Sequence, residues 1–100
     1  MTTIDYLVPI HPGEVLMGDF IEGFGITQNK LAVAIHVPPR RINEIVHGKR
    51  AITADTALRL GKYFGTSAQF WLNLQTHYDL DLAEDRVAEQ IAAITPLKVA

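Results

Sequence analysis

Apolar residues recur at helical spacing along the whole chain, in stretches separated by glycine, proline and capping residues. In the first stretch Leu16, Phe20 and Ile21 lie at i, i+4 and i+5, which is the spacing of one helix face. Pro12 suits the first turn of this helix, and Gly23 is a typical residue at its end. The pattern predicts a helix that begins at Pro12.

Two short helices follow, with a tight turn between them. Thr27 is a good N-cap for a helix from Gln28 to about Ile35. Pro38 disfavours the helical conformation at the residue before it, so this helix must stop by His36. Pro39 can begin the next helix, which we expect to end near His47. Two short helices joined by such a turn are typical of a helix-turn-helix.

The remainder of the chain predicts two more helices. Thr53 caps one that Gly65 ends, and Ser67 caps the next. Residues 66–95 contain neither glycine nor proline, so we expect one long helix or two helices joined by a bend near 79–81. Strand patterns are absent. The sequence therefore predicts a single all-α domain, 1–100, as a compact five-helix bundle with an extended C-terminal helix.

The third helix has two distinct faces. At 100° per residue Ile42, Ile45 and Val46 share one arc, which we expect to face the core. We expect the second helix to pack through Leu31, Ala34 and Ile35, with Ala32 small enough to let the third helix approach. The opposite face of the third helix is polar and consists of Arg40, Asn43, Glu44 and His47, with Arg41 at its edge.

This polar face has the chemistry of a major-groove reader. Arginine can donate two hydrogen bonds to guanine, asparagine pairs with adenine, and a glutamate can accept from cytosine. In helix-turn-helix proteins the first turn of the motif's second helix reaches the bases, and in this chain that helix is the third, which begins at Pro39. The candidate base-reading residues are Pro39, Arg40, Asn43 and Glu44. The candidate contacts to the DNA backbone are Thr27, Gln28, Lys30, Arg41, His47, Lys49 and Arg50, and Arg41 could equally read a base.

The distribution of charge supports a nucleic-acid partner despite a net charge of −2. Residues 30–62 carry a net charge of +5, whereas residues 1–29 carry −4 and residues 63–100 carry −3. Binding to phosphate depends on the local field, so a basic segment in an acidic chain can still bind DNA.

The segment TQNKLAVAIHVPPRRINEIVHGKR, residues 27–50, resembles the helix-turn-helix of the phage-repressor (Xre) superfamily. His36 stands where a turn glycine is common, and histidine tolerates the left-handed conformation better than most residues. Further segments resemble the HigA-type antitoxins of bacterial toxin–antitoxin operons: HPGEVL at 11–16, RINEIVHGKRAITADTALRLGKYFG at 41–65 and FWLNLQTHYDL at 70–80. The resemblance covers about residues 9–82, and its last segment is the most specific because generic repressors lack it.

The resemblance implies a phage-repressor-like fold, repression of the protein's own operon, and binding of a HigB-type toxin, a ribosome-dependent mRNA endonuclease of the RelE fold. Two alternatives remain open. One is a stand-alone Xre-family repressor without a toxin partner. The other is a helical protein-interaction module that has lost DNA binding, which the basic residues of the helix-turn-helix argue against.

The C-terminal helix, about residues 67–94, carries an aromatic stripe at helical spacing, and core packing is the default interpretation for part of it. A chain of 100 residues has limited core in which to bury the whole stripe. We therefore expect a homodimer, which would place two third helices ~34 Å apart on a palindromic operator. The candidate dimer-interface residues are Phe70, Trp71, Leu74 and Tyr78.

Other functions have little support in the sequence. The four histidines match no metal-ligand spacing, cysteine is absent, and no nucleophile has a base nearby in the sequence. We therefore expect no enzyme activity, metal, cofactor or small-molecule substrate. The chain lacks a signal peptide and a membrane-spanning segment, so we expect a cytoplasmic protein. Whether residues 1–10 are ordered stays open.

Overall fold

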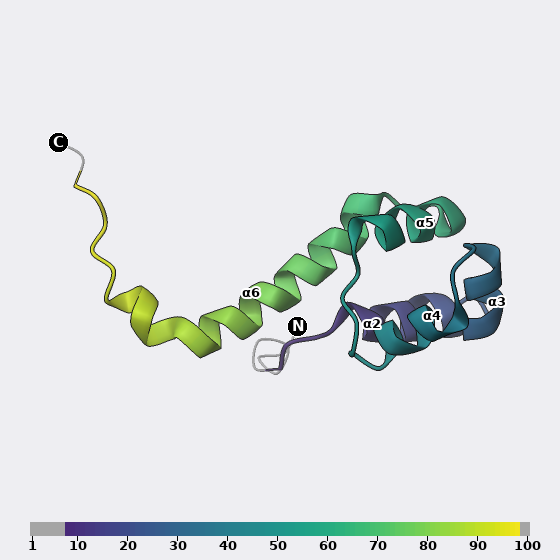
Figure 1. Ribbon diagram of the computed structural model, residues 1–100, viewed down its shortest axis with the longest axis horizontal. Helices are drawn as coiled ribbons and strands as arrows, with labels where there is room; N and C mark the ends of the chain where they lie inside the picture. Colours follow the sequence, from purple (N-terminus) through teal and green to yellow (C-terminus); the bar gives the residue numbers. More distant parts are fainter. Residues whose placement is uncertain (1–7, 99–100) are drawn as a thin grey trace.

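The computed structural model describes residues 8–98. Its helices are α2 (Pro12–Val15), η1 (Leu16–Glu22), α3 (Gln28–Ala34), α4 (Pro39–Val46), α5 (Ala54–Phe64) and α6 (Ala68–Ala92) (Figure 1). Since η1 continues α2 directly as a π-helical segment, the described residues form five helices and no strand. The all-α prediction is confirmed. Of residues 1–10, whose order the sequence leaves open, residues 1–7 lie outside the described range.

Local capping chemistry sets the helix boundaries where the sequence predicts them. The side-chain oxygens of Thr27, Thr53 and Ser67 each accept a hydrogen bond from a backbone N–H in the first turn of the following helix. Gly65 adopts the left-handed conformation that ends α5, with φ of 78°. These caps depend on residues close together in the sequence, which is why the pattern alone locates them.

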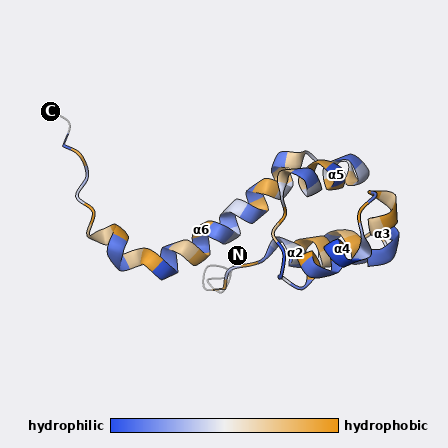
Figure 2. Cartoon of the chain, in the orientation of Figure 1, coloured by the Kyte–Doolittle hydropathy of each residue, from blue (hydrophilic) through white to orange (hydrophobic). Residues whose placement is uncertain are grey.

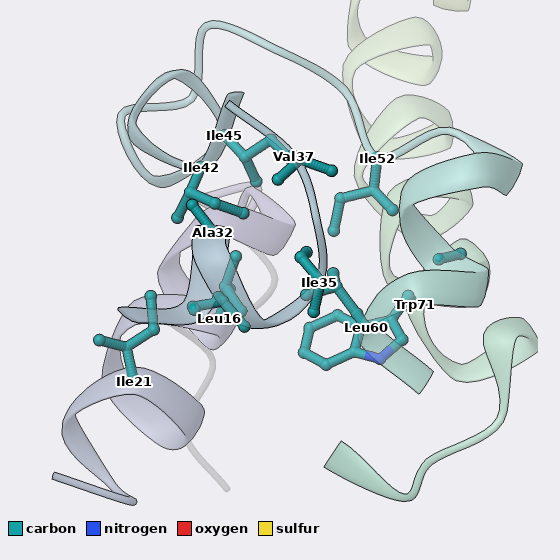
Figure 3. Close-up of a cluster of buried hydrophobic side chains, with 12 residues drawn as sticks. Leu16, Ile21, Ala32, Ile35, Val37, Ile42, Ile45, Ile52, Leu60 and Trp71 are labelled. Atoms are coloured by element: carbon teal, nitrogen blue, oxygen red, sulfur yellow. The ribbon is translucent and has the colours of Figure 1, made fainter. Parts of the chain in front are cut away.

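The core lies where η1, α3, α4, α5 and the first turn of α6 meet (Figure 3). Its fully buried side chains include Leu16, Leu31, Ile42, Leu60 and Trp71. Ala32 is also fully buried, as expected for a small residue between two packed helices. Ala34 is exposed, so its prediction as an inner-face residue was wrong. Ala34 is the last residue of the helix, and the buried side of the chain continues at the next residue, Ile35.

The short helix α2 is packed tightly against two other helices. Nδ1 of His11 accepts a hydrogen bond from the Gly13 N–H (2.9 Å), and Glu14 accepts one from the His11 N–H (3.3 Å). The His11 ring meets Tyr78 of α6 edge-on at 4.9 Å. Burial lowers the pKa of His11, while the carboxylates of Glu14 and Asp79 act in the opposite direction. On the side of α4, a Cβ built on Gly13 would overlap the Ile45 carbonyl.

The outer part of α6 projects away from the other helices (Figure 1). The described chain measures 55 × 29 × 24 Å, and its radius of gyration is 16.7 Å, against ~13 Å for a compact domain of 100 residues. The prediction of an extended C-terminal helix is therefore right, and the prediction of overall compactness is wrong. Of the two forms expected for this part of the chain, the structure has the single long helix; its non-helical residue is Val87 (φ −119°, ψ 18°), and no bend occurs near 79–81. Apolar and polar residues both occur along the projecting part (Figure 2).

Candidate nucleic-acid interface

The turn between α3 and α4 has the tight geometry of a helix-turn-helix. His36 takes a left-handed conformation with φ of 63°, in agreement with its prediction at a glycine-like position. The next residue, Val37, is buried, and its N–H donates to the Ala32 carbonyl over 3.0 Å. The turn is thus closed by a backbone hydrogen bond and held by an apolar side chain in the core.

Helix α4 presents the two faces that its sequence predicts. Ile42 and Ile45 are fully buried, and Val46 packs against the core while remaining half-buried. The opposite face exposes Arg40, Asn43 and His47, with Glu44 half-buried beside them. Pro39 is the first residue of α4, so Arg40 lies in the first turn. In helix-turn-helix proteins this N-terminal end of the helix contacts the bases in the major groove.

Two arginines share the carboxylate of Glu44. Nε of Arg40 donates to one oxygen over 3.0 Å, and Nε of Arg50 donates to the other over 2.9 Å. The hydrogen bonds from Arg50 and Arg40 lower the pKa of the Glu44 carboxyl. Glu44 therefore remains ionised wherever α4 is folded at neutral pH. Each carboxylate oxygen of Glu44, which the sequence suggests as a cytosine reader, thus accepts a hydrogen bond from an arginine of the same chain.

The start of α3 lies beside α4. The Asn43 amide donates to the Gln28 side chain over 3.3 Å, and the Gln28 amide reaches Met17 Sδ at 3.8 Å. Thr27 caps α3 through the N–H of Lys30. The candidate backbone contacts Lys30 and Lys49 are both exposed. The contact between Asn43 and Gln28 thus brings the start of α3 beside the exposed face of α4.

A second carboxylate, Asp55, is shared by Arg41 and Arg59. Nη1 of Arg41 donates to Asp55 over 2.8 Å, and Nε of Arg59 does so over 3.0 Å, and these bonds, first that of Arg59, lower the pKa of the Asp55 carboxyl. Nη1 of Arg59 also donates to the carbonyls of Ile35 (2.8 Å) and His36 (3.2 Å). Arg41 therefore belongs to a network that fastens the turn to α5. The sequence analysis missed Asp55 and Arg59, although their i,i+4 spacing in α5 is a visible signal.

The candidate dimer residues in α6 do not form one exposed surface. Trp71 is fully buried, and its indole N–H donates to Thr66 over 2.8 Å, so its prediction as a dimer contact was wrong. Leu74 and Tyr78 are partly buried against the bundle, and Phe70 is 37% exposed. The physical reason is that the start of α6 closes the core against η1 and α5.

Searches of the described residues for other kinds of site give two results. No group of three or more His, Asp or Glu side chains could hold a metal ion within residues 8–98. No helix in the same range is long and apolar enough to cross a membrane.

Comparison with known proteins gives consistent matches. Residues 20–71 match the helix-turn-helix family. Virulence-associated protein I of Dichelobacter nodosus is 54% identical over 88 residues, 88% of this chain and 81% of that protein. Antitoxin HigA-1 of Vibrio cholerae serotype O1 is 34% identical over 91 residues, 91% of this chain and 86% of that protein. The structure of Pseudomonas aeruginosa antitoxin HigA with higBA promoter has a TM-score of 0.86 and 48% identity, covering 91% of this chain and 100% of that chain.

Proposed function

The chain belongs to the helix-turn-helix family and, within it, to the HigA-type antitoxins, and from this membership we propose that it binds its own promoter through α4 and neutralises a HigB-type toxin. The relative from Pseudomonas aeruginosa is a HigA antitoxin solved with higBA promoter. By the same reasoning this chain is a DNA-binding antitoxin of a toxin–antitoxin module that represses its own operon.

The observation that carries the DNA-binding proposal is the position of Arg40. Its side chain is 86% exposed at the first turn of α4, while the buried face of the same helix is fixed in the core. Asn43 lies one turn further along the same exposed face. Arg40 and Asn43 are therefore proposed as base readers, and Lys30, Lys49 and Arg50 as contacts to phosphates on either side.

We expect Arg40→Ala to lower the ability to discriminate operator from altered operator by ~1–3 kcal/mol at one base pair, because a bidentate contact to that base is lost. Gel-shift titrations with operator duplexes that each carry one base-pair change measure this effect. Lys49→Ala is the matched control, since it removes one positive charge beside the same helix. It should weaken binding to all duplexes alike and lower the salt slope by about 1. An unchanged ranking of the duplexes with Arg40→Ala would contradict a reading role for this residue.

A second copy of the chain is the proposed partner of the outer part of α6. Leu80 and Ile91 are each more than half exposed on a helix that projects away from its own bundle. Burial of such apolar surface between two copies is favourable, and a two-fold pair suits a palindromic operator. The proposal moves the dimer contact outward from Phe70 and Trp71, the positions expected from the sequence.

We expect Ile91→Glu to shift the protein from dimer to monomer at micromolar concentration, because a carboxylate would be buried in the contact. Gln90→Glu adds the same charge at the neighbouring exposed position and should leave the dimer intact. Sedimentation equilibrium distinguishes the two masses. A dimer mass for the wild type and for both variants would show that the dimer contact does not include Ile91.

The acidic flanks of the chain support the proposal of a basic toxin partner. Residues 1–29 and 63–100 carry net charges of −4 and −3, outside the basic helix-turn-helix. Co-expression with the product of the neighbouring gene tests this proposal directly. A complex that co-purifies and abolishes the mRNA cleavage by that product supports it, whereas unimpeded cleavage favours a stand-alone repressor.

A further inference from the structure

The carboxylate of Glu44 lies between the two arginines that flank the exposed face of α4. Arg40 comes from the first turn of α4, and Arg50 comes from the loop that follows the helix. The Glu44 side chain is 25% exposed, and the Arg50 side chain is 47% exposed. The carboxylate thus lies lower on the surface than the guanidinium groups that it joins.

Both contacts use the same nitrogen of the arginine. Nε of Arg40 and Nε of Arg50 each donate to Glu44, at 3.0 and 2.9 Å. A guanidinium carries five N–H donors, of which four belong to the two terminal nitrogens. Within residues 8–98 the terminal nitrogens of these two arginines make no hydrogen bond to the protein. Each arginine therefore keeps its end-on fork available for guanine or phosphate oxygens.

The other shared carboxylate provides a comparison within the same chain. Asp55 also accepts from two arginines, but there a terminal nitrogen of Arg59 donates to backbone carbonyls of the turn. Through these carbonyls Arg59 fastens the turn to α5, so that network has a structural purpose. The network of Glu44 has the same ionic pattern, and its remaining donors point to a ligand outside the chain.

Charge gives Glu44 a second effect. Two arginines at this surface without a counter-ion would attract any phosphate, and such contacts carry no sequence information. One ionised carboxylate between them removes one unit of that charge. It also holds each flexible arginine stem in one arrangement before DNA arrives, which reduces the entropy lost on binding.

We propose that Glu44 is a positioning residue for operator discrimination: it fixes Arg40 toward a base and Arg50 toward a phosphate, and it weakens binding to unrelated DNA. The proposal rests on the proposed function, because it concerns the same DNA-binding surface. It differs from the cytosine-reading role that the sequence suggests for Glu44, because each carboxylate oxygen already accepts a hydrogen bond from an arginine.

The test compares wild type with Glu44→Gln and Glu44→Asp on the operator and on a scrambled duplex, over a series of salt concentrations. Glu44→Gln should bind the scrambled duplex about three- to tenfold more tightly and raise the salt slope by about 1. The reason is that the variant lacks the carboxylate charge that neutralises one of the two arginines facing phosphate. The ratio of scrambled to operator Kd should fall about tenfold. Glu44→Asp keeps the charge but shortens the side chain, so the scrambled affinity should stay near wild type while the ratio falls.

Glu22→Gln is the matched control, because it removes one exposed carboxylate from η1, outside both the helix-turn-helix and the proposed dimer contact on α6. Its Kd ratio should equal that of wild type. A Glu44→Gln ratio equal to that of the control, or a preference altered at one base pair with unchanged scrambled affinity, would overturn the positioning role. If wild type itself does not prefer its promoter over the scrambled duplex, the proposed function fails, and the positioning role fails with it.

Discussion

Replacing Trp71 with alanine is expected to lower the free energy of unfolding by ~3–5 kcal/mol. The indole is fully buried, and its ring lies 4.7 Å from that of Phe20 and 6.2 Å from that of Phe64, measured between centroids. Its N–H also donates to Thr66 over 2.8 Å, so the truncation removes that hydrogen bond as well. The side chain joins η1, α5 and α6, so its truncation leaves a cavity between these helices. Urea denaturation at one fixed protein concentration measures the loss.

Phe70→Ala is the natural control, because Phe70 precedes Trp71 in the same helix and is also in contact with it, at 5.0 Å between ring centroids. Its side chain is 37% exposed, so its truncation removes less buried surface and leaves a site open to water. We expect less than half the loss seen with Trp71→Ala. Equal losses for the two variants would mean that Trp71 is not the centre of this part of the core.

Gly13→Ala is expected to cost ~3 kcal/mol, although it adds a single methyl group. The added Cβ would overlap the Ile45 carbonyl oxygen and lie 2.7 Å from the carbonyl carbon, and both are backbone atoms that cannot rotate away. Helices α2 and α4 must therefore separate. Since α4 carries the proposed DNA-reading face, the operator affinity of the variant should also fall. Thermal unfolding and gel-shift titration measure the two effects.

Gly18→Ala provides the comparison for Gly13→Ala. A Cβ at Gly18 meets nothing within 4 Å, and the residue lies inside the helical segment η1. Alanine is favoured over glycine in a helix by about 1 kcal/mol, so this variant should be neutral or more stable than wild type. A loss of stability at Gly18 that matches the loss at Gly13 would rule out the close α2–α4 approach as the cause.

Much of the fold follows from local sequence. Thr27, Thr53 and Ser67 cap their helices through residues three positions away, and His36 takes the left-handed conformation at the turn. Ile42 and Ile45 are buried because the helical period alone places them on one face. The exposed face of α4 could be predicted for the same reason.

Tertiary packing decides the features that sequence reasoning missed. The aromatic residues at the start of α6 look alike in sequence, yet Trp71 closes the core while Phe70 lies at its edge. The pairing of Arg41 with Asp55 joins positions 14 apart in the chain, and the pairing of Arg59 with the Ile35 carbonyl joins positions 24 apart. No periodic pattern reports such contacts. The role of Glu44 also depends on its neighbours, because sequence alone does not show that Arg50 returns to it.

The packing of α2 between α4 and α6 restricts the angle between these two helices. Gly13 meets the backbone of α4, and His11 meets Tyr78 of α6, so three consecutive residues set the tilt between the two helices. A helix of 25 residues is ~37 Å long, and a tilt of ~5° would move its far end by ~3 Å. In a dimer joined near that end, this displacement would change the distance between the two α4 helices, which must match the helical repeat of DNA. In the proposed dimer, the close contacts at His11 and Gly13 would therefore limit the variation in distance between the two α4 helices.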